Sequence, residues 1–102
     1  MATHGHIARF VVKSGRRAEA AEILKPMLRQ VLDEPGTLLY LMHESLSEPD
    51  VIWFYERYAD EAAFKRHMES AVHHYVVAKL MPLLDPATKV HWLELVGAKK
   101  FA

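Results

Sequence analysis

The sequence predicts an α+β fold of the ferredoxin-like type, with the element order βαββαβ and a second helix that is split in two. Three observations predict it: an apolar stripe at helical spacing early in the chain, two consecutive apolar strands in the middle, and a capped helix directly after them. With 102 residues the chain is long enough for one packed core and too short for two. We therefore expect a single domain over residues 1–102.

The first strand is expected over residues 6–13, where apolar and β-branched side chains are frequent, and it ends at Ser14 and Gly15. A helix over residues 16–32 follows, because apolar residues recur there at three- and four-residue spacings. Pro26 inside this helix removes one backbone hydrogen bond, so we expect a kink or a break. The segment 34–36 then ends the helix and turns the chain.

The next two strands are expected over residues 37–44 and 51–58. Asp60 can cap the helix that follows, and Glu61 in its first turn complements the helix dipole. The second part of this helix is expected from about residue 70 to residue 84. The chain then ends its regular structure with a last strand.

That last strand is expected over residues 88–96, and like the middle strands it carries apolar residues on both faces. An antiparallel sheet with one wet face alternates apolar and polar residues, but the segments 38–42 and 51–55 do not alternate. Two helices can cover only one face of such a sheet, so the other face needs a partner. We expect a homodimer, and the competing interpretation is a monomer with an exposed aromatic patch.

Composition excludes several classes of function. The 13 basic and 13 acidic residues give a net charge of zero, which is not the electrostatic footprint of a nucleic-acid-binding protein. The chain has no cysteine, so disulfides, thiolate metal sites and a cysteine nucleophile are excluded. No apolar run approaches the ~20 residues of a membrane span, and the N-terminus does not read as a secretion signal. We expect a cytoplasmic protein with no membrane or nucleic-acid partner.

His67 is the leading candidate for chemistry. It shares the apolar face of its predicted helix with Phe64 and Met68, so its side chain should point into the space between the sheet and the helices. A histidine there suits a general base or a donor to a substrate oxyanion, because its pKa lies near the working pH. The competing interpretation is a core histidine satisfied by a backbone carbonyl or a tyrosine.

Glu56 and Tyr40 are candidates from the middle strands. A carboxylate on a mostly buried strand either pairs with a cation, such as Arg9 or Arg57, or titrates abnormally as a catalytic group. The phenol of Tyr40 could orient a quinone oxygen. Alternatively, Tyr40 is a core residue whose hydroxyl is bonded to a neighbour.

The remaining histidines predict no metal site. His73 and His74 are adjacent, so on a helix they point about 100° apart and cannot chelate one ion together. His67 and His74 are two turns apart, and His4 and His6 lie in a terminal segment without obvious partners. With four glycines there is also little room for a phosphate-binding loop. We expect no metal and no nucleotide or flavin cofactor.

The segments EPGTLLY (34–40), YERY (55–58) and ADEAAFKRHMES (59–70) combine a helix stop, two strand segments and a capped helix with an inward histidine. In this order the chain resembles the antibiotic biosynthesis monooxygenase (ABM) domain, a family of small dimeric α+β barrels. The resemblance covers about the whole chain and is strongest in these segments. ABM domains commonly have a histidine at the position of His67. Glu56 stands at the acidic residue of the family's Glu-x-Trp strand motif, with Tyr58 at the tryptophan.

The resemblance implies a homodimeric monooxygenase that oxidises a small aromatic, phenolic or quinol substrate with dioxygen, without metal or flavin. Such an enzyme needs an apolar pocket, a base, and hydrogen bonds to the resulting oxyanion. The candidate catalytic residues are then His67, Glu56, Tyr40 and His73. The candidate pocket residues, which as an aromatic and Met stripe also read as ordinary core, are Phe10, Met42, Phe54, Tyr58, Phe64 and Met68.

Departures from two subfamilies narrow this expectation. Haem-degrading relatives use an asparagine, a tryptophan and a histidine, and the nearest positions here are Ala8, His67 and Val77, so that triad is absent. Anthrone oxygenases of the family use an asparagine and a tryptophan on the third strand, where this chain has Phe54 and Tyr58. The broad quinol-monooxygenase-like group is the match that remains.

In that group a second histidine often follows the first by five residues. That position is Val72 here, and His73 serves if the helix junction has one extra residue. Two other functions stay open: an isomerase or lactone-processing enzyme on the same scaffold, and a non-catalytic dimer that binds a small ligand. Oxygen use separates the first of these from a monooxygenase, and a pocket filled by side chains would indicate the second.

Overall fold

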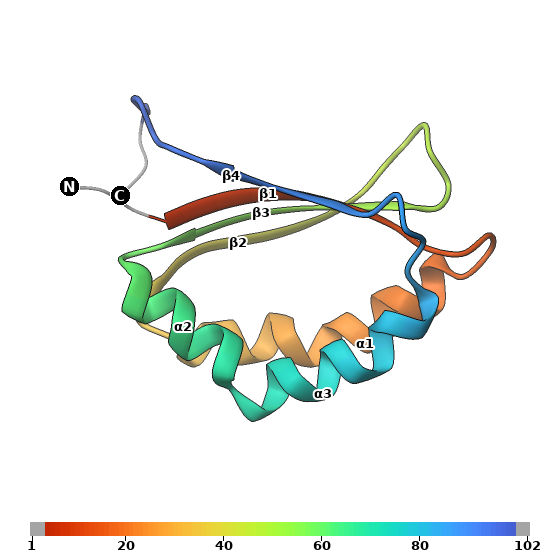
Figure 1. Ribbon diagram of the computed structural model, residues 1–102, viewed down its shortest axis with the longest axis horizontal. Helices are drawn as coiled ribbons and strands as arrows, with labels where there is room; N and C mark the ends of the chain where they lie inside the picture. The colour runs from red at the N-terminus through yellow and green to blue at the C-terminus, as the bar shows by residue number, and fades with distance from the viewer. Residues whose placement is uncertain (1–3, 100–102) are drawn as a thin grey trace.

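The computed structural model describes residues 4–99. One antiparallel sheet with the strand order β2-β3-β1-β4 is covered by the helices on a single face, as Figure 1 shows. The expected ferredoxin-like α+β fold is therefore confirmed. In chain order the elements are β1 (His4–Val11), α1 (Arg17–Gln30), η1 (Val31–Asp33), β2 (Thr37–Glu44), β3 (Val51–Tyr58), α2 (Glu61–Glu69), α3 (Ala71–Leu80), η2 (Met81–Leu83) and β4 (Lys89–Leu93).

The ends of three elements differ from the sequence expectation. Strand β1 starts two residues early, because His4 pairs with Tyr58 and extends the ladder with β3. Strand β4 ends at Leu93, three residues earlier than expected. Leu93 pairs with Gly5, and only His4 of β1 lies beyond that pair. In the described part of the chain, residues 94–96 therefore have no partner strand. Helix α3 ends at Leu80 and tightens into the 3₁₀ helix η2.

Helix α1 runs without a break through Pro26, so of the expected kink or break the break is wrong. The missing N–H of Pro26 removes one hydrogen bond, but the helix is held on both sides of that residue by the core. Ala20, Leu24 and Met27 are all buried against the sheet side of the molecule. Packing of this stripe outweighs the local preference of proline, as tertiary contacts commonly do.

The second helix is split at Ser70. Asp60 begins α2 as expected, since its carboxylate accepts a hydrogen bond of 2.8 Å from the backbone N–H of Ala63. Ser70 then leaves helical geometry and caps α3, because its hydroxyl accepts from the N–H of His73 at 3.1 Å. The two short helices therefore change direction at one residue and together cover one side of the sheet (Figure 1).

The core lies between the sheet and the helices. On the strands the inward positions alternate, so that Ala8 on β1 pairs with Phe54 on β3, and Met42 on β2 pairs with the same phenylalanine from the other side. Leu24 and Val76 meet this layer from α1 and α3. None of the helices in the described residues combines the length and apolar character needed to cross a bilayer.

The opposite face of the sheet carries apolar side chains that no helix covers. Ile7 and Leu41 both pair with Tyr55. Two residues along the same strands, Arg9 pairs with Trp53 on this face. Leu41 is 40% exposed and Leu93, at the end of β4, is 46% exposed. This face is the one that the helices leave open in Figure 1.

Gly36 marks the closest approach between the turn before β2 and helix α2. A Cβ atom at this position would lie 2.4 Å from the Cβ of Ala63, and the carbonyl of Gly36 accepts the N–H of Ala59 at 2.8 Å. Only glycine allows the turn to lie this close to the helix.

We predict that Gly36→Ala lowers the free energy of unfolding by about 1–3 kcal/mol, because the new methyl group forces the turn away from α2. Urea denaturation followed by circular dichroism measures this change. Gly97→Ala is the matched control, since no atom lies within 4 Å of a Cβ added there. Equal stability of the two variants would contradict the close packing of this turn.

Candidate active site

A cavity of about 360 Å³ lies between the sheet and the helices. The four candidate catalytic residues, His67, Glu56, Tyr40 and His73, all line it. Strands β2 and β3 supply the tyrosine and the carboxylate, and helices α2 and α3 supply the two histidines. The tertiary structure therefore brings to one cavity four side chains that the sequence spreads over 34 positions, from 40 to 73.

Four of the six expected pocket residues also line the cavity: Phe10, Phe54, Phe64 and Met68. The other two expected pocket residues do not reach it. Met42 packs against the core from β2. Tyr58 is fully buried behind the wall, where its ring contacts the rings of Phe64 and His67 at centroid distances of 5.2 and 5.3 Å.

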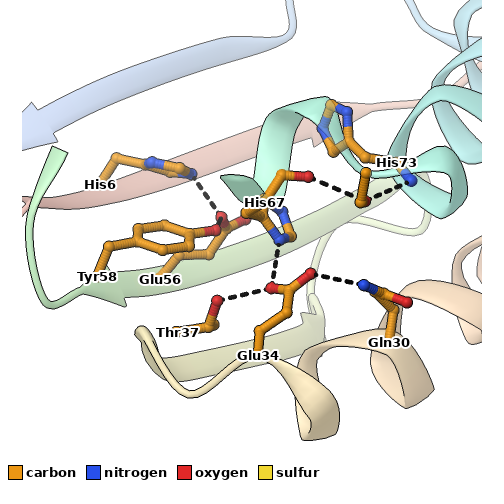
Figure 2. A network of polar contacts seen from close by, with 9 residues as sticks. His6, Gln30, Glu34, Thr37, Glu56, Tyr58, His67 and His73 are labelled. Atoms are coloured by element: carbon orange, nitrogen blue, oxygen red, sulfur yellow. Dashed lines mark hydrogen bonds and ion pairs between the residues drawn. The ribbon is translucent and has the colours of Figure 1, made fainter. Parts of the chain in front are cut away.

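His67 is held by a carboxylate. Its Nδ1 lies 2.8 Å from Oε1 of Glu34, and only 3% of His67 is exposed (Figure 2). Glu34 is in turn fixed by the hydroxyl of Thr37, which donates to Oε1 at 2.6 Å, and by the amide of Gln30, which donates to Oε2 at 3.1 Å. The competing interpretation of His67 as a core histidine named a backbone carbonyl or a tyrosine as its partner, and the observed partner of Nδ1 is Glu34.

The protonation state of Glu34 decides which nitrogen of His67 carries the proton. Burial raises the pKa of Glu34, but hydrogen bonds from Thr37, His67 and Gln30 outweigh burial and hold that pKa below its ordinary value. Glu34 is thus a carboxylate at neutral pH and can only accept, so Nδ1 of His67 donates to it. In the neutral form of an imidazole held in this way, the other nitrogen, Nε2, is an acceptor.

Nε2 of His67 is free to meet a ligand. No hydrogen bond joins it to any residue in the described range 4–99. Two side-chain atoms in that range are buried and have no hydrogen-bond partner, Nδ1 of His6 and Nδ1 of His73. Nε2 of His67 is not one of these buried, unpartnered atoms. A neutral imidazole with one nitrogen anchored and the other open is the arrangement that proton abstraction requires.

Glu56 pairs with neighbours that differ from the expected ones. Its Oε1 accepts a hydrogen bond of 2.5 Å from the hydroxyl of Tyr58 and lies 3.1 Å from Nε2 of His6 (Figure 2). Arg9, an expected partner, instead lies 2.5 Å from Glu48, because it points to the other face of β1. Arg57 follows Glu56 in β3 and so also belongs to the opposite face.

The two buried tyrosines stay protonated. Burial raises the pKa of Tyr58 far above its ordinary value, and the charge of Glu56 raises it further. Burial likewise raises the pKa of Tyr40, with Glu56 and Glu34 adding to the shift. The hydroxyl of Tyr40 has no hydrogen-bond partner within residues 4–99, so the expected bond to a neighbour is absent there and the hydroxyl can serve a ligand in the cavity.

His73 lies against His67 with a ring-centroid distance of 5.2 Å and lines the cavity. Burial lowers the pKa of His73, and the neighbouring His67 lowers it further, so His73 is neutral at neutral pH. Val72, the other residue considered for this place, packs against the core. Of these two residues, His73 is the one that faces the cavity.

Three residues of the site escaped the sequence analysis. His6 lines the cavity because it alternates with Ala8 on the inner face of β1, and that alternation was a usable signal. Trp92 on β4 also lines the cavity, with its ring 4.7 Å from that of His6. Glu34 read only as part of a helix stop, and no local pattern links it to a histidine 33 positions away.

The polar groups of the site show no arrangement typical of a metal centre. Within the described range there is no group of three or more His, Asp or Glu side chains placed to hold a metal ion.

We predict that Glu34→Gln is less stable than the wild type at pH 7, and that this difference shrinks as the pH falls below about 4.5, the ordinary pKa of a glutamate. A carboxyl group whose pKa is lowered by folding stabilises the native state above its unfolded pKa, and the effect is lost when the native carboxylate protonates. Urea denaturation of both proteins between pH 3 and pH 7 measures the difference. A difference that stays constant over this range would contradict the lowered pKa.

The comparisons with known proteins identify the family and agree with the fold. The family model described as antibiotic biosynthesis monooxygenase (ABM) matches residues 3–79. No curated protein matches the chain significantly.

Solved structures share the fold at low sequence identity. A Caulobacter crescentus protein, provisionally named an antibiotic biosynthesis monooxygenase, is 26% identical with a TM-score of 0.85, over 94% of this chain and 92% of that chain. Rv0793 from Mycobacterium tuberculosis is 24% identical with a TM-score of 0.85, over 94% and 97%. A Nitrosomonas europaea protein of the same provisional name is 18% identical with a TM-score of 0.86, over 92% and 99%. Because the family model covers most of the sequence, the chain belongs to the antibiotic biosynthesis monooxygenase family.

Proposed function

We propose that the cavity is the active site of a cofactor-independent monooxygenase that oxidises a small phenolic or quinol substrate with dioxygen. The observation that carries the proposal is His67: its Nδ1 is anchored by Glu34 at 2.8 Å, and its Nε2 is an acceptor open to a ligand. Family membership supports the same reaction class. The cavity volume of about 360 Å³ falls in the range of small-molecule sites.

The first step is removal of a hydroxyl proton from the substrate. A phenol that donates to Nε2 of His67 passes its proton to the imidazole, and Glu34 stabilises the imidazolium that forms. The carboxylate also prevents the ring from turning, so the same nitrogen always faces the substrate. Glu34 is therefore a positioning residue, and His67 is the base.

The second step is the reaction of the electron-rich oxyanion with dioxygen. The imidazolium of His67 and the protonated hydroxyl of Tyr40 both lie on the cavity wall and can donate to the substrate oxygen. One oxygen atom enters the product, and the other leaves as water with two hydrogens from the substrate. The aromatic lining, which includes Phe10, Phe54 and Phe64, keeps bulk water from the charged intermediate.

We predict that His67→Ala lowers the rate of oxygen uptake by roughly 10²-fold or more, since a lost general base has effects of this size. The assay follows enzyme-dependent oxygen uptake with a panel of reduced quinones and anthrones, in the presence of a metal chelator and after subtraction of the uncatalysed rate. His74→Ala is the matched control, because His74 is exposed on α3 and does not line the cavity.

A second variant separates two roles of His67. Gln at position 67 keeps a hydrogen bond but cannot take the proton, so His67→Gln should stay as slow as His67→Ala if the residue is a base. Recovery of most of the rate would indicate that His67 only orients the substrate. Conversion of a substrate without oxygen uptake would favour an isomerase or lactone-processing enzyme, and binding without conversion would favour a ligand-binding protein.

We further propose that two copies of the chain pair through the open face of the sheet. The support is the apolar character of that face, where Ile7, Leu41 and Tyr55 lie together. An uncovered apolar sheet face is rare in a monomer, and a two-fold interface buries the same face on both copies.

We predict that sedimentation equilibrium of the wild type gives twice the chain mass of 11.7 kDa at micromolar concentration. Leu41→Lys should give the mass of one chain, because it places a charge in the centre of the proposed interface. Leu46→Lys is the matched control, since Leu46 is fully exposed in the loop between β2 and β3. A wild type with the mass of one chain would refute the dimer.

A further inference from the structure

The cavity between the sheet and the helices has one wall at the edge of the molecule. Strand β4 is the edge strand next to β1, and all five of its residues are exposed. The register places Trp92 opposite His6 and Val90 opposite Ala8, and paired residues of an antiparallel ladder share a face. Both β4 side chains therefore lie on the inner face of the sheet, where they line the cavity.

The residues that line the cavity differ in exposure. More than half of them are buried, among them Ala8, Phe54 and His67. Within residues 4–99, four apolar residues of the lining are instead exposed: Trp92 (53%), Val90 (48%), Met68 (40%) and Val77 (37%). A side chain that borders both the cavity and solvent lies at the boundary between them, so these four residues mark the mouth of the cavity.

Helix α2 borders solvent on the other side of this mouth. Phe64 and Met68 lie one turn apart on α2 and share a face of that helix. Both line the cavity, and both also line an open hollow on the surface of α2, together with the charged residues Glu61, Lys65 and Glu69. At this point two side chains stand between the cavity and solvent, and one of them is a flexible methionine.

Trp92 joins the two sides of the mouth. Its ring packs edge-on against the ring of Phe64 at a centroid distance of 4.9 Å, and against the ring of His6 at 4.7 Å. A contact between two rings is a weak interaction, and exposed side chains change rotamer rapidly. The contact between β4 and α2 can therefore open without unfolding of either element.

We propose that ligands enter the cavity through the mouth between β4 and helices α2 and α3, and that Trp92 limits the size of the ligand that enters. This inference adds an entry route and a size filter to the proposed function, and it rests on that function only in taking this cavity as the site. The four residues of the mouth are uncharged, so the mouth favours an uncharged ligand. Trp92 and Val90 lie on the inner face of the sheet, so pairing of two copies through the opposite face leaves the mouth open.

The chain has no cysteine, so a single introduced thiol can report access to the cavity. Ala8→Cys places a thiol at a buried position that lines the cavity, and Ala20→Cys places one at a similarly buried core position that does not. Both thiols are labelled under native conditions with two uncharged reagents, the small methyl methanethiosulfonate and the two-ring compound 4,4′-dithiodipyridine. Mass spectrometry follows the labelling rate. With the small reagent, Ala8→Cys should react at least about tenfold faster than Ala20→Cys, because a thiol in the core reacts only when the structure opens.

Trp92→Ala in the Ala8→Cys protein should raise the rate for the two-ring reagent by roughly tenfold and the rate for the small reagent by less than about threefold, because a wider mouth lowers the barrier mainly for the larger molecule. Tyr75→Ala is the matched control, since Tyr75 is an exposed aromatic residue of α3 that does not line the cavity. Trp92→Ala in the Ala20→Cys protein measures the part of the change that comes from lower stability. If Ala8→Cys does not fold, Val76→Cys replaces it, since Val76 is also buried and lines the cavity.

Labelling of the cavity thiol at the rate of the core thiol would refute an open route into the cavity. An equal effect of Trp92→Ala on both reagents, or no effect, would refute Trp92 as the size filter. A labelling rate that falls as the protein concentration rises would show that a second copy covers the mouth, and would also overturn the inference.

The outcome is separable from that of the proposed function, because labelling needs no turnover. Labelling that depends on Trp92, combined with no oxygen uptake on any substrate, would refute the monooxygenase and keep the mouth. Oxygen uptake that depends on His67, combined with labelling that does not depend on Trp92, would refute the mouth alone.

Discussion

The hydrogen bond between His67 and Glu34 is the interaction on which the site depends. It joins helix α2 to the turn before β2, two segments that are 33 residues apart in the sequence. The bond forms because Gly36 lets the turn approach Ala63 more closely than any side chain would allow. One contact therefore sets the orientation of the imidazole and selects its tautomer.

The cavity combines a mostly apolar lining with polar groups that are held from behind. Thr37 and Gln30 hold Glu34, and Tyr58 holds Glu56, and none of these three residues lines the cavity. Such outer contacts reduce the loss of freedom when a ligand binds. They also keep charge inside an apolar space without an unsatisfied partner, which would otherwise be costly.

Local patterns in the sequence predicted most of the fold and part of the site. The limits of β2 and β3 follow directly from runs of apolar residues, and Asp60 marks the start of α2. The inward direction of His67 follows from the period of one helix. Prediction failed where a strand depends on its partner: β4 stops at Leu93, which pairs with Gly5, and in the described residues only His4 of β1 lies beyond that pair.

The sequence alone determined the element order, the apolar sheet with two candidate faces, and the helix that carries His67, because each of these depends on neighbours a few positions away. Tertiary structure decided the partners of the ionisable groups. Glu34 meets His67, His6 meets Glu56, and Arg9 turns away to Glu48. No local period contains these pairings, since they arise from the order in which strands join the sheet and from the close approach of one turn to one helix.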